Sequence, residues 1–352
     1  MTMAATGDEA AVLTRVDGGL GRIELNKPKA INALSADMVT IIDDTLTAWK
    51  DDDAVRAVLV TGSGDRGLCA GGDIKAIHRG IVEGTNEAVD FWADEYRMNH
   101  DIAHYPKPYI AIMDGITMGG GVGISVHGSH RIVTETSKIG MPETGIGLFP
   151  DVGGTFLLAR IPQKGVGMHL ALTGQPIGAG DAIRYGLADT FVPRERIEDL
   201  ASAIAGSDDD VDAVIARFAE EPPASELVAD EDWIASAYDG DTAAEVVAAL
   251  RAHADERARA AGDLIATKSP LSVTVTFEMV RTAGDMSLDE VLERDFRAGS
   301  GISAQPDLRE GIRAQVIDKD RNPQWSPASL DEVDPALVTS ILSTEQTRKV
   351  FS

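Results

Sequence analysis

The sequence predicts an α/β fold in which repeated ββα units are followed by a mostly helical C-terminal region. Over residues 1–200, short apolar and β-branched runs alternate with glycine-rich loops and with segments of helical spacing. Residues 201–352 are instead rich in alanine, aspartate and glutamate and carry the larger share of the acidic excess. We therefore expect a ββα core at 1–200 and a helical region at 201–352 that packs on it.

A hairpin and a helix are expected first. Residues 12–16 and 21–25 alternate in polarity around Asp17-Gly18-Gly19, which is typical of a β-hairpin. Ser35 is a suitable N-cap, and the apolar residues behind it recur at helical spacing. This segment therefore predicts a strand pair followed by an amphipathic helix.

The units that follow repeat the order of strand, glycine-rich loop and helix. The expected strands are a continuous apolar run at 57–61, a strand at 109–113 and short strands at 131–134 and 138–141. The glycine-rich loops are expected at 62–72, 115–121 and 144–154. Helices are expected at 88–103 and from Thr155, and the pattern after Val192 is helical, with breaks at Pro222-Pro223 and Lys268-Ser269-Pro270. In such units, ligands bind at the loop ends.

Charge and cysteine content exclude several classes of function. The net charge is −25, and a surface this negative repels phosphate backbones and anionic lipids, so neither nucleic acid nor membrane is an expected partner. The single cysteine, Cys69, excludes an intramolecular disulfide and a multi-cysteine zinc site. The chain lacks an apolar run long enough to span a bilayer, and its first residues do not resemble a targeting peptide, so we expect a cytoplasmic protein.

Two glycine-rich segments are expected to expose backbone N–H groups at the ends of loops. In Cys69-Ala70-Gly71-Gly72-Asp73-Ile74, small residues precede a helix for which Asp73 suits the N-cap; alone, this segment could be an ordinary tight loop. Residues 115–123 contain four glycines in five positions, which disfavour a helix, so close packing or a polarised ligand atom must require them. This second segment matches neither a P-loop nor a dinucleotide-binding fingerprint.

Two carboxylates lie in the apolar, glycine-rich segment 141–154. Glu143 and Asp151 in such surroundings would have raised pKa values and could act as acid, base or nucleophile. Equally, Asp151 could cap the helix from Thr155 and Glu143 could lie at the surface. From the residues alone, Asp94-Glu95-Tyr96-Arg97 is expected to be a solvated charged helix face.

Other chemistries lack their patterns. Ser125, His127 and His130 occur without the G-x-S-x-G elbow of serine hydrolases. The histidines do not have metal-ligand spacing, so no metal is expected. Cys69 has no histidine nearby in the sequence and is expected to be a small packing residue.

These segments together resemble the crotonase (enoyl-CoA hydratase/isomerase) superfamily. Four of them match in order: LNKPKAINAL at 25–34, CAGGDI at 69–74, GITMGGGVG at 115–123 and MPETGIGLFPDVGG at 141–154. Within the superfamily, the chain resembles the 3-hydroxyisobutyryl-CoA hydrolase family through DEYRMN at 94–99, KSPLSV at 268–273 and DKDRNPQW at 318–325. The resemblance covers roughly residues 10–335.

The resemblance implies a crotonase-type spiral of ββα units and an acyl-CoA substrate. CoA enters as part of the substrate, so no separate cofactor is implied. The backbone N–H groups of Gly72 and Gly120 would form an oxyanion hole. The remaining substrate-binding positions that it implies are Glu95, Gly71, Asp73, Ile74, Lys27, Lys29 and Ala30, of which the last three would lie against CoA.

One difference from the family pattern, at Gly123, favours the hydrolase branch of the superfamily. Family hydratases carry a second catalytic glutamate where this chain has Gly123, whereas Glu143 is kept and Asp151 and Glu95 match acidic positions of the hydrolase branch. We therefore expect hydrolysis of a 3-hydroxyacyl-CoA thioester, with 3-hydroxyisobutyryl-CoA in valine degradation as the substrate. Glu143 would attack the carbonyl or activate a water, and both routes stay open.

Two alternative functions and one further property also stay open. A hydratase or isomerase of the same fold would need to work without the second glutamate, and a non-catalytic acyl-CoA-binding protein would not need Glu143 and Asp151. The sequence also leaves a homo-oligomer open.

Overall fold

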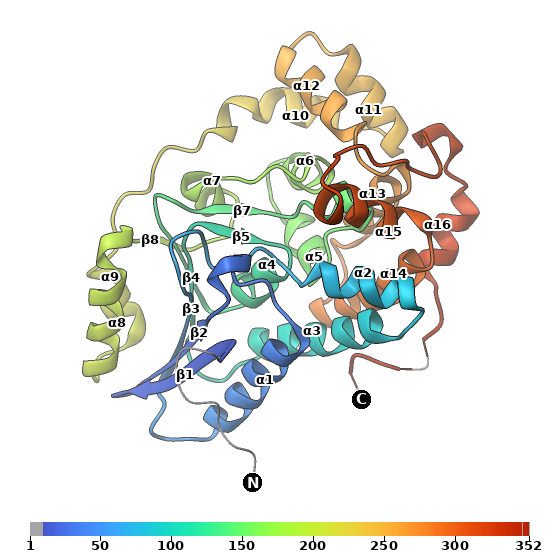
Figure 1. The fold of residues 1–352 in the computed structure, drawn as a ribbon. Coiled ribbons are helices and arrows are strands. Elements are labelled where there is room, and N and C mark those ends of the chain that lie inside the picture. Colours follow the sequence, from blue (N-terminus) through green and yellow to red (C-terminus); the bar gives the residue numbers. More distant parts are fainter. Residues whose placement is uncertain (1–9, 347, 352) are drawn as a thin grey trace. The chain divides into compact units, whose positions relative to one another are not determined.

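The computed structural model describes residues 10–346 and 348–351 (Figure 1). These residues form two compact units, and each unit is built from several segments of the chain. The first unit comprises residues up to 72, 98–139 and 177–225; the second comprises 73–97, 140–176 and the residues from 226 onward. The division at residue 200 that the composition suggests stays a prediction.

A six-stranded sheet lies at the centre of the described part of the first unit. Its strand order is β1-β2-β3-β4-β6-β8; β1 is antiparallel to β2, and the other neighbours are parallel. The strands are β1 (Val12–Asp17), β2 (Leu20–Leu25), β3 (Ala57–Gly62), β4 (Tyr109–Met113), β6 (His130–Val133) and β8 (Thr190–Phe191). The predicted hairpin is confirmed, because β1 and β2 pair throughout their length.

Helices cover both faces of this sheet (Figure 1). Alternate strand residues, among them Leu20, Leu59 and Ile112, pack in one cluster with residues of α8 (Ile197–Gly206) and α9 (Val211–Ala216). On the other side, α1 (Ala36–Lys50) contacts β1 and β2, and α4 (Gly120–Val126) contacts β4. Because both faces are covered, β3 and β4 are apolar runs without alternation, which confirms the prediction of a strand buried on both faces at 57–61.

A second, two-stranded sheet positions the glycine-rich loops. It pairs β5 (Ile116–Met118) with β7 (Lys138–Gly140), and an isolated parallel bridge adds Cys69 to Thr117 of β5. The loop that ends at Gly72 therefore runs beside the strand that leads into α4. The first unit also contains α7 (Ala179–Arg184).

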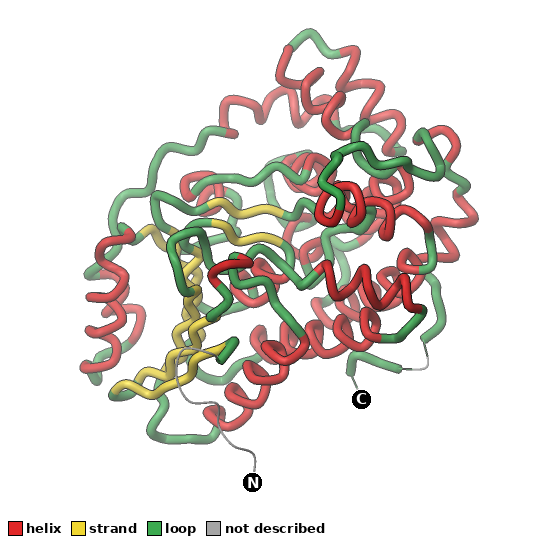
Figure 2. The backbone as a smooth tube through the Cα atoms, viewed as in Figure 1, coloured by secondary structure: helices red, strands yellow, loops and turns green. Residues whose placement is uncertain are grey.

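The described part of the second unit consists of helices and loops (Figure 2). Its helices are α2 (Ile74–Glu83), α5 (Gly154–Leu158), α6 (Val166–Thr173), α10 (Glu231–Ala237), α11 (Ala243–Ala252), α12 (Glu256–Ile265), α13 (Pro270–Thr282), α14 (Leu288–Ser303), α15 (Pro306–Ile312) and α16 (Pro335–Leu342), together with most of α3 (Glu87–Ala103). Helix α13 packs against α5 and α6, and α14 packs against α16. The helical character predicted after residue 192 is thereby confirmed.

Local sequence signals set several of these helix starts. Ser269 caps α13, its hydroxyl accepting from Ser272 N–H, and Pro270 occupies the first turn, where its missing N–H is harmless. Ser287 and Glu290 form a capping box at α14. The predicted break at Lys268-Ser269-Pro270 is therefore confirmed as a helix start.

Single helical turns complete the described chain. They are η1 (Pro28–Ala30), η2 (Glu143–Ile146), η3 (Arg194–Arg196), η4 (Leu227–Asp230), η6 (Leu330–Glu332) and the π-helical turn η5 (Arg313–Ile317). Within the described residues, every helix is too short or too polar to cross a bilayer.

Candidate active site

The glycine-rich loops of the first unit approach each other closely. Cys69 N–H donates to Ile116 O at 3.1 Å and Met118 N–H donates to Cys69 O at 2.9 Å, so residue 69 continues the small sheet. A Cβ at Gly121 would lie 2.4 Å from Cys69 O, which is closer than real side chains come. Close packing therefore explains the glycine at 121, and the buried Cys69 is one side of that packing.

Two backbone N–H groups in these loops have no acceptor among the described residues. Gly72 N and Gly120 N donate no hydrogen bond there, although Leu34 N–H holds the neighbouring Gly71 O at 2.9 Å. Gly120 is the first residue of α4, where N–H groups have no intrahelical partner. A Cβ on Gly71 would lie 3.7 Å from Gly120 N, so the two loops lie next to each other. The pair of donors is compatible with an oxyanion hole.

The lysine-bearing turn η1 is fixed by an asparagine that the sequence analysis missed. Asn32 is fully buried with φ +54°, and its Oδ1 accepts from Lys27 N–H at 2.9 Å. Its Nδ2 donates to Ser63 O and Gly67 O, both at 3.1 Å. This side chain joins η1, in which Lys29 and Ala30 are exposed, to the glycine-rich loop 62–72. The lysines therefore project from a fixed turn.

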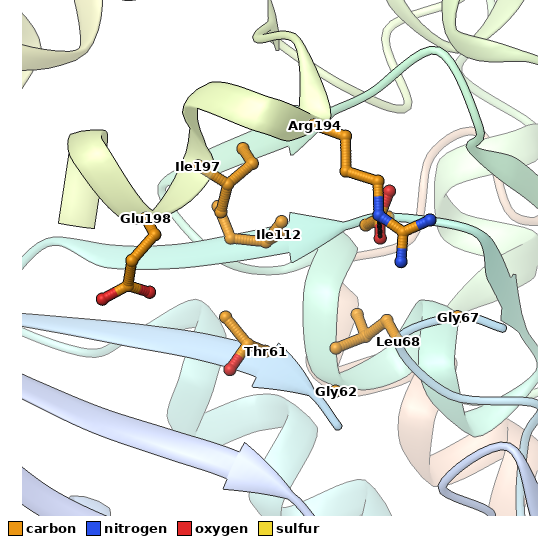
Figure 3. A pocket seen from close by; sticks show the side chains of 9 residues that line it. Thr61, Gly62, Gly67, Leu68, Ile112, Arg194, Ile197 and Glu198 are labelled. Carbon is orange, nitrogen blue, oxygen red and sulfur yellow. Dashed lines mark ion pairs between the residues drawn. The ribbon is translucent and has the colours of Figure 1, made fainter. Parts of the chain in front are cut away.

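A cavity of about 210 Å³ lies at the carboxyl ends of β3 and β4 (Figure 3). It is lined by Thr61, Gly62, Gly67, Leu68, Ile112, Asp114, Arg194, Ile197 and Glu198. Arg194 Nε pairs with Asp114 at 3.1 Å and makes one side of the lining ionic. The cavity is smaller than the usual binding pocket for an organic ligand, so it has room only for a small group.

Helix α3 brings a carboxyl group into the interior of the second unit. Trp92, Glu95, Tyr96 and Asn99 recur at the spacing of one helix face and are all buried. Asp94 and Arg97 remain partly exposed and pair at 3.2 Å. The prediction of a solvated charged face at 94–97 is therefore wrong for Glu95 and Tyr96, and this spacing is the signal that could have identified them.

Glu143 opens η2 and is buried as well, with 6% of its surface exposed. Leu148 N–H donates to Glu143 O at 3.0 Å and fixes the turn. The Oε2 atom of Glu143 has no hydrogen-bond partner among the described residues. Burial, and next the nearby Asp151, raise the pKa of Glu143 well above its usual value. The alternative of a surface glutamate is therefore wrong.

Asp151 accepts a hydrogen bond from a buried tyrosine. Tyr96 Oη donates to Asp151 Oδ2 at 2.7 Å, and the N-cap of α5 is Gly153, so the alternative in which Asp151 caps this helix is wrong. Burial raises the pKa of Asp151 to about 6, although the Tyr96 hydrogen bond opposes this rise. Burial, and next Asp151, also raise the pKa of Glu95.

The sequence analysis missed a further buried carboxyl group, that of Asp295 on α14. It is fully buried, and its Oδ2 accepts from Gly153 N–H at 3.0 Å. Burial raises the pKa of Asp295 to about 8, against the lowering influence of Arg294. Nothing in the local sequence marks this residue, because its partner lies 142 positions earlier in the chain.

The C-terminal motifs brace the turn that carries Glu143. Ser269 N–H donates to Thr144 O of η2 at 3.3 Å, and Ser269 Oγ donates to Asp307 Oδ2 at 2.5 Å. Asp307 also accepts from Ser326 N–H at 2.8 Å through its other oxygen. A Cβ on Gly145 would lie 3.5 Å from Lys268 Nζ, and burial lowers the pKa of this lysine. The segment 268–273 therefore braces the turn that carries Glu143, and the backbone at Ser326, just after the segment 318–325, holds Asp307.

The geometry of the second unit allows acid–base or nucleophilic chemistry. Glu95, Glu143 and Asp151 are buried within electrostatic range of one another, so ionising one raises the pKa of the others. Carboxyl groups with raised pKa values can give or take a proton, and the ionised form of such a group can attack a carbonyl carbon. The remaining predicted positions, Asp73 and Ile74, begin α2, where Asp73 Oδ1 accepts from Ala76 N–H at 3.2 Å.

Comparisons with known proteins show the family to which the chain belongs. The chain matches the enoyl-CoA hydratase/isomerase family over residues 20–342. It is 37% identical to the protein named 3-hydroxyisobutyryl-CoA hydrolase, mitochondrial, of Xenopus tropicalis, covering 98% of this chain and 91% of that one. The human protein of that name is 36% identical, covering 92% and 86%.

Two solved structures are similar over nearly their full length. A carnitinyl-CoA dehydratase from Mycobacterium thermoresistibile is 49% identical with a TM-score of 0.92, covering 97% of this chain and 98% of that one. An enoyl-CoA hydratase from Rhodobacter sphaeroides 2.4.1 is 41% identical with a TM-score of 0.91, covering 97% and 99%. The predicted fold class is thereby confirmed, and the chain belongs to the enoyl-CoA hydratase/isomerase (crotonase) family.

Proposed function

We propose that this protein hydrolyses the thioester of a 3-hydroxyacyl-CoA, with 3-hydroxyisobutyryl-CoA as the substrate and 3-hydroxyisobutyrate and CoA as the products. The observation that carries the proposal is the burial of Glu143 beside Glu95 and Asp151, with one Glu143 oxygen free of partners among the described residues. The relatives named as hydrolases of this substrate, at 36–37% identity, support it.

The thioester oxygen would be held by backbone donors. Gly72 N–H and Gly120 N–H, which have no other acceptor among the described residues, would bind the negative charge that develops on this oxygen. Each such donor lowers the barrier by roughly 3 kcal/mol in comparable sites. Glycine at 71 and 121 allows the two loops to pack closely enough to present both donors.

Glu143 would act on the carbonyl carbon in one of two ways. As a nucleophile, its carboxylate attacks the carbonyl, the C–S bond breaks and CoA leaves as the thiol after taking a proton; water then hydrolyses the mixed anhydride. As a base, Glu143 takes a proton from the water that attacks. Both routes give one acid and one thiol per water consumed.

Asp151 and Glu95 would recognise the substrate hydroxyl. Buried carboxyl groups can accept or donate a hydrogen bond according to their protonation, and both are buried close to Glu143. The CoA portion would lie against Lys27, Lys29 and Ala30 of the η1 segment, where cations suit its phosphates. The start of α2 at Asp73 and Ile74 would complete the substrate contacts.

A second function, hydration or dehydration of an acyl-CoA, is favoured by the names of the two similar structures. It is disfavoured by Gly123, at the position where the family resemblance places the second hydratase glutamate. The names of the curated relatives place those proteins in mitochondria. A cytoplasmic location stays a prediction for this chain.

The test is an assay of both reactions on one preparation. Free-thiol release from 3-hydroxyisobutyryl-CoA is compared with loss of the enoyl absorbance of crotonyl-CoA. We expect rapid thiol release and slow hydration. Fast hydration with negligible thiol release would assign the protein to the hydratases, and tight acyl-CoA binding without either reaction would make it a binding protein.

A further inference from the structure

We infer that Tyr96 and Asp295 are positioning residues that hold the Asp151 carboxyl group from two sides. Tyr96 acts directly on Asp151 through its hydroxyl group, and Asp295 acts through the backbone of the loop that follows. The role of Asp151 in the reaction rests on the proposed function. The contacts that hold Asp151 in place are independent of that proposal.

The contact from Tyr96 has a fixed direction. Tyr96 is fully buried, and its Oη lies 2.7 Å from Asp151 Oδ2. Burial, and next the charge of Asp151, raise the pKa of Tyr96 far above its usual value, so the phenol keeps its proton at working pH. The tyrosine therefore donates, and Asp151 Oδ2 must accept, which favours the ionised form of Asp151.

The contact from Asp295 holds an unusual backbone conformation. Val152 and Gly153 have φ values of +50° and +76°, and a β-branched residue such as valine rarely adopts a positive φ. Strain of this kind persists only where the surroundings fix it. Asp295 Oδ2 accepts from Gly153 N–H at 3.0 Å and Asp151 O accepts from Gly154 N–H at 2.6 Å. These two bonds fix the loop immediately after Asp151.

The charged and titratable groups that face Asp151 come from three elements. Helix α3 contributes Glu95 and Tyr96, η2 contributes Glu143, and α14 contributes Asp295 with Arg294 beside it. Among these, Tyr96 is the one whose hydrogen bond lowers the pKa of Asp151. A residue that only filled space would influence this titration through burial alone, so removing the Tyr96 hydroxyl group while keeping its ring distinguishes positioning from packing.

The first experiment removes the tyrosine oxygen alone. Tyr96→Phe keeps the ring, and Asp151 is followed by carboxyl-carbon NMR in protein labelled with ¹³C-aspartate, its resonance being assigned by its loss in Asp151→Asn. We expect the Asp151 titration to move up by about one pH unit, the loss expected for one hydrogen bond to a charged group. The acidic limb of kcat/KM should move with it.

The matched control is Tyr238→Phe. Tyr238 is also buried in the second unit, and its Oη bonds to His169 Nδ1 at 2.8 Å, apart from the carboxyl groups named above. It should lose comparable stability in a thermal melt without moving the Asp151 titration. An unchanged titration in Tyr96→Phe, or an equal shift in Tyr238→Phe, would overturn the role of Tyr96.

The second experiment compares two replacements of Asp295. Asp295→Asn keeps an oxygen that can accept from Gly153 N–H, whereas Asp295→Leu keeps the size and removes the acceptor. The measured quantity is the ratio of kcat/KM for 3-hydroxyisobutyryl-CoA to kcat/KM for isobutyryl-CoA. We expect this ratio to stay within about threefold of the wild-type value in the asparagine variant and to fall about tenfold in the leucine variant. Equal preferences in the two variants would show that Asp295 only fills space.

These readouts separate the inference from the proposed function. The Asp151 titration requires no substrate, so a shift in Tyr96→Phe supports positioning even if the wild type releases no thiol. In that case the Asp295 pair is compared on the reaction that the wild type does catalyse. Thiol release by the wild type with an unmoved titration would retain the hydrolase and reject the role of Tyr96.

Discussion

At the scale of single residues, the proposed reaction depends on carboxyl groups whose ionisation burial disfavours. Burial, and next Asp151, raise the pKa of Glu143. Burial also raises the pKa of Asp151, but the hydrogen bond from the Tyr96 hydroxyl group lowers it again in part. The environment therefore gives neighbouring acids different proton affinities, which is how one site can contain both an ionised and a protonated carboxyl group. Their roles can be separated by isosteric substitution.

Glu143→Gln should abolish most of the turnover. The amide keeps the shape of the side chain and removes its basicity and nucleophilicity, so we expect kcat to fall by at least ~10²-fold while substrate binding persists. Asp151→Asn should cost less if Asp151 orients the substrate. Thiol release is measured for both, with folding checked by thermal melting; a folded Glu143→Gln enzyme at the wild-type rate would contradict the mechanism.

The substrate hydroxyl should matter to specificity. A site whose buried polar groups meet a hydroxyl leaves them unpaired when an analogue lacks it, which lowers kcat/KM by several-fold to ~10⁴-fold. We expect such a preference for 3-hydroxyisobutyryl-CoA over isobutyryl-CoA, and a smaller one in Glu95→Gln and Asp151→Asn. Equal kcat/KM values for the two thioesters in the wild type would remove both residues from hydroxyl recognition.

At the scale of elements, the spacing of residues along one helix determines which side chains enter the site. Glu95 lies in a charged tetrapeptide, yet its position between Trp92 and Asn99 on one face of α3 buries it. The hairpin, the strands β3, β4, β6 and β7 and several helix starts follow from local patterns, so the sequence alone predicts them. The prediction of a loop at 115–121 is wrong for β5, which pairs with β7, and β8 is not among the predicted strands. The contacts of Asp295 with Gly153 and of Asn32 with Gly67 depend on chain segments far apart, and local patterns therefore cannot reveal them.

The junction between α4 and the Cys69 loop should not tolerate a methyl group. In Gly121→Ala, the new Cβ would lie 2.4 Å from Cys69 O, so one loop must shift, and we expect a loss of about 1–3 kcal/mol in the free energy of unfolding. Gly206→Ala is the matched control, because its Cβ meets nothing within 4 Å and it ends helix α8. This control should be neutral or slightly stabilised in denaturant melts. Equal stability of both variants would refute the close packing.

Turnover should respond to backbone geometry at the neighbouring position. Gly120 is buried at the first residue of α4, and its N–H donor has no acceptor among the described residues. A branched side chain in Gly120→Val should crowd the loop or turn the N–H away, which we expect to lower kcat by about 10²-fold or more. Near-normal thioester hydrolysis by the folded variant would exclude Gly120 from the oxyanion hole.

At the scale of the whole molecule, buried acids link stability to pH. The pKa of Asp295 rises to about 8 on folding, so the folded state binds a proton that the unfolded state has already lost above pH 4. Its contribution to stability is therefore complete below about pH 4 and is lost progressively as the pH rises from there through 8. His169, whose pKa burial lowers to about 4, has the opposite effect, but only below about pH 6.5.

Between pH 6.5 and 8, the wild type should therefore lose roughly 1.6 kcal/mol of unfolding free energy through Asp295. The slope is about 1.4 kcal/mol per pH unit while Asp295 is protonated and falls to half of that at its pKa. Asp295→Asn cannot lose this proton and should be flatter over that range. Urea melts of both proteins at several pH values measure the difference. Parallel curves for the two proteins would show that Asp295 does not hold a proton in the folded state.

The raised pKa values of Glu95, Glu143 and Asp151 also have a calorimetric consequence. A ligand that settles against these carboxyl groups changes their surroundings, and protons then pass between the protein and the solution as it binds. The buffer takes up or releases these protons, so its ionisation enthalpy adds to the heat measured on binding. Binding enthalpies measured in phosphate and in Tris should therefore differ, and the slope against the buffer's ionisation enthalpy counts the protons exchanged when the substrate or an analogue binds.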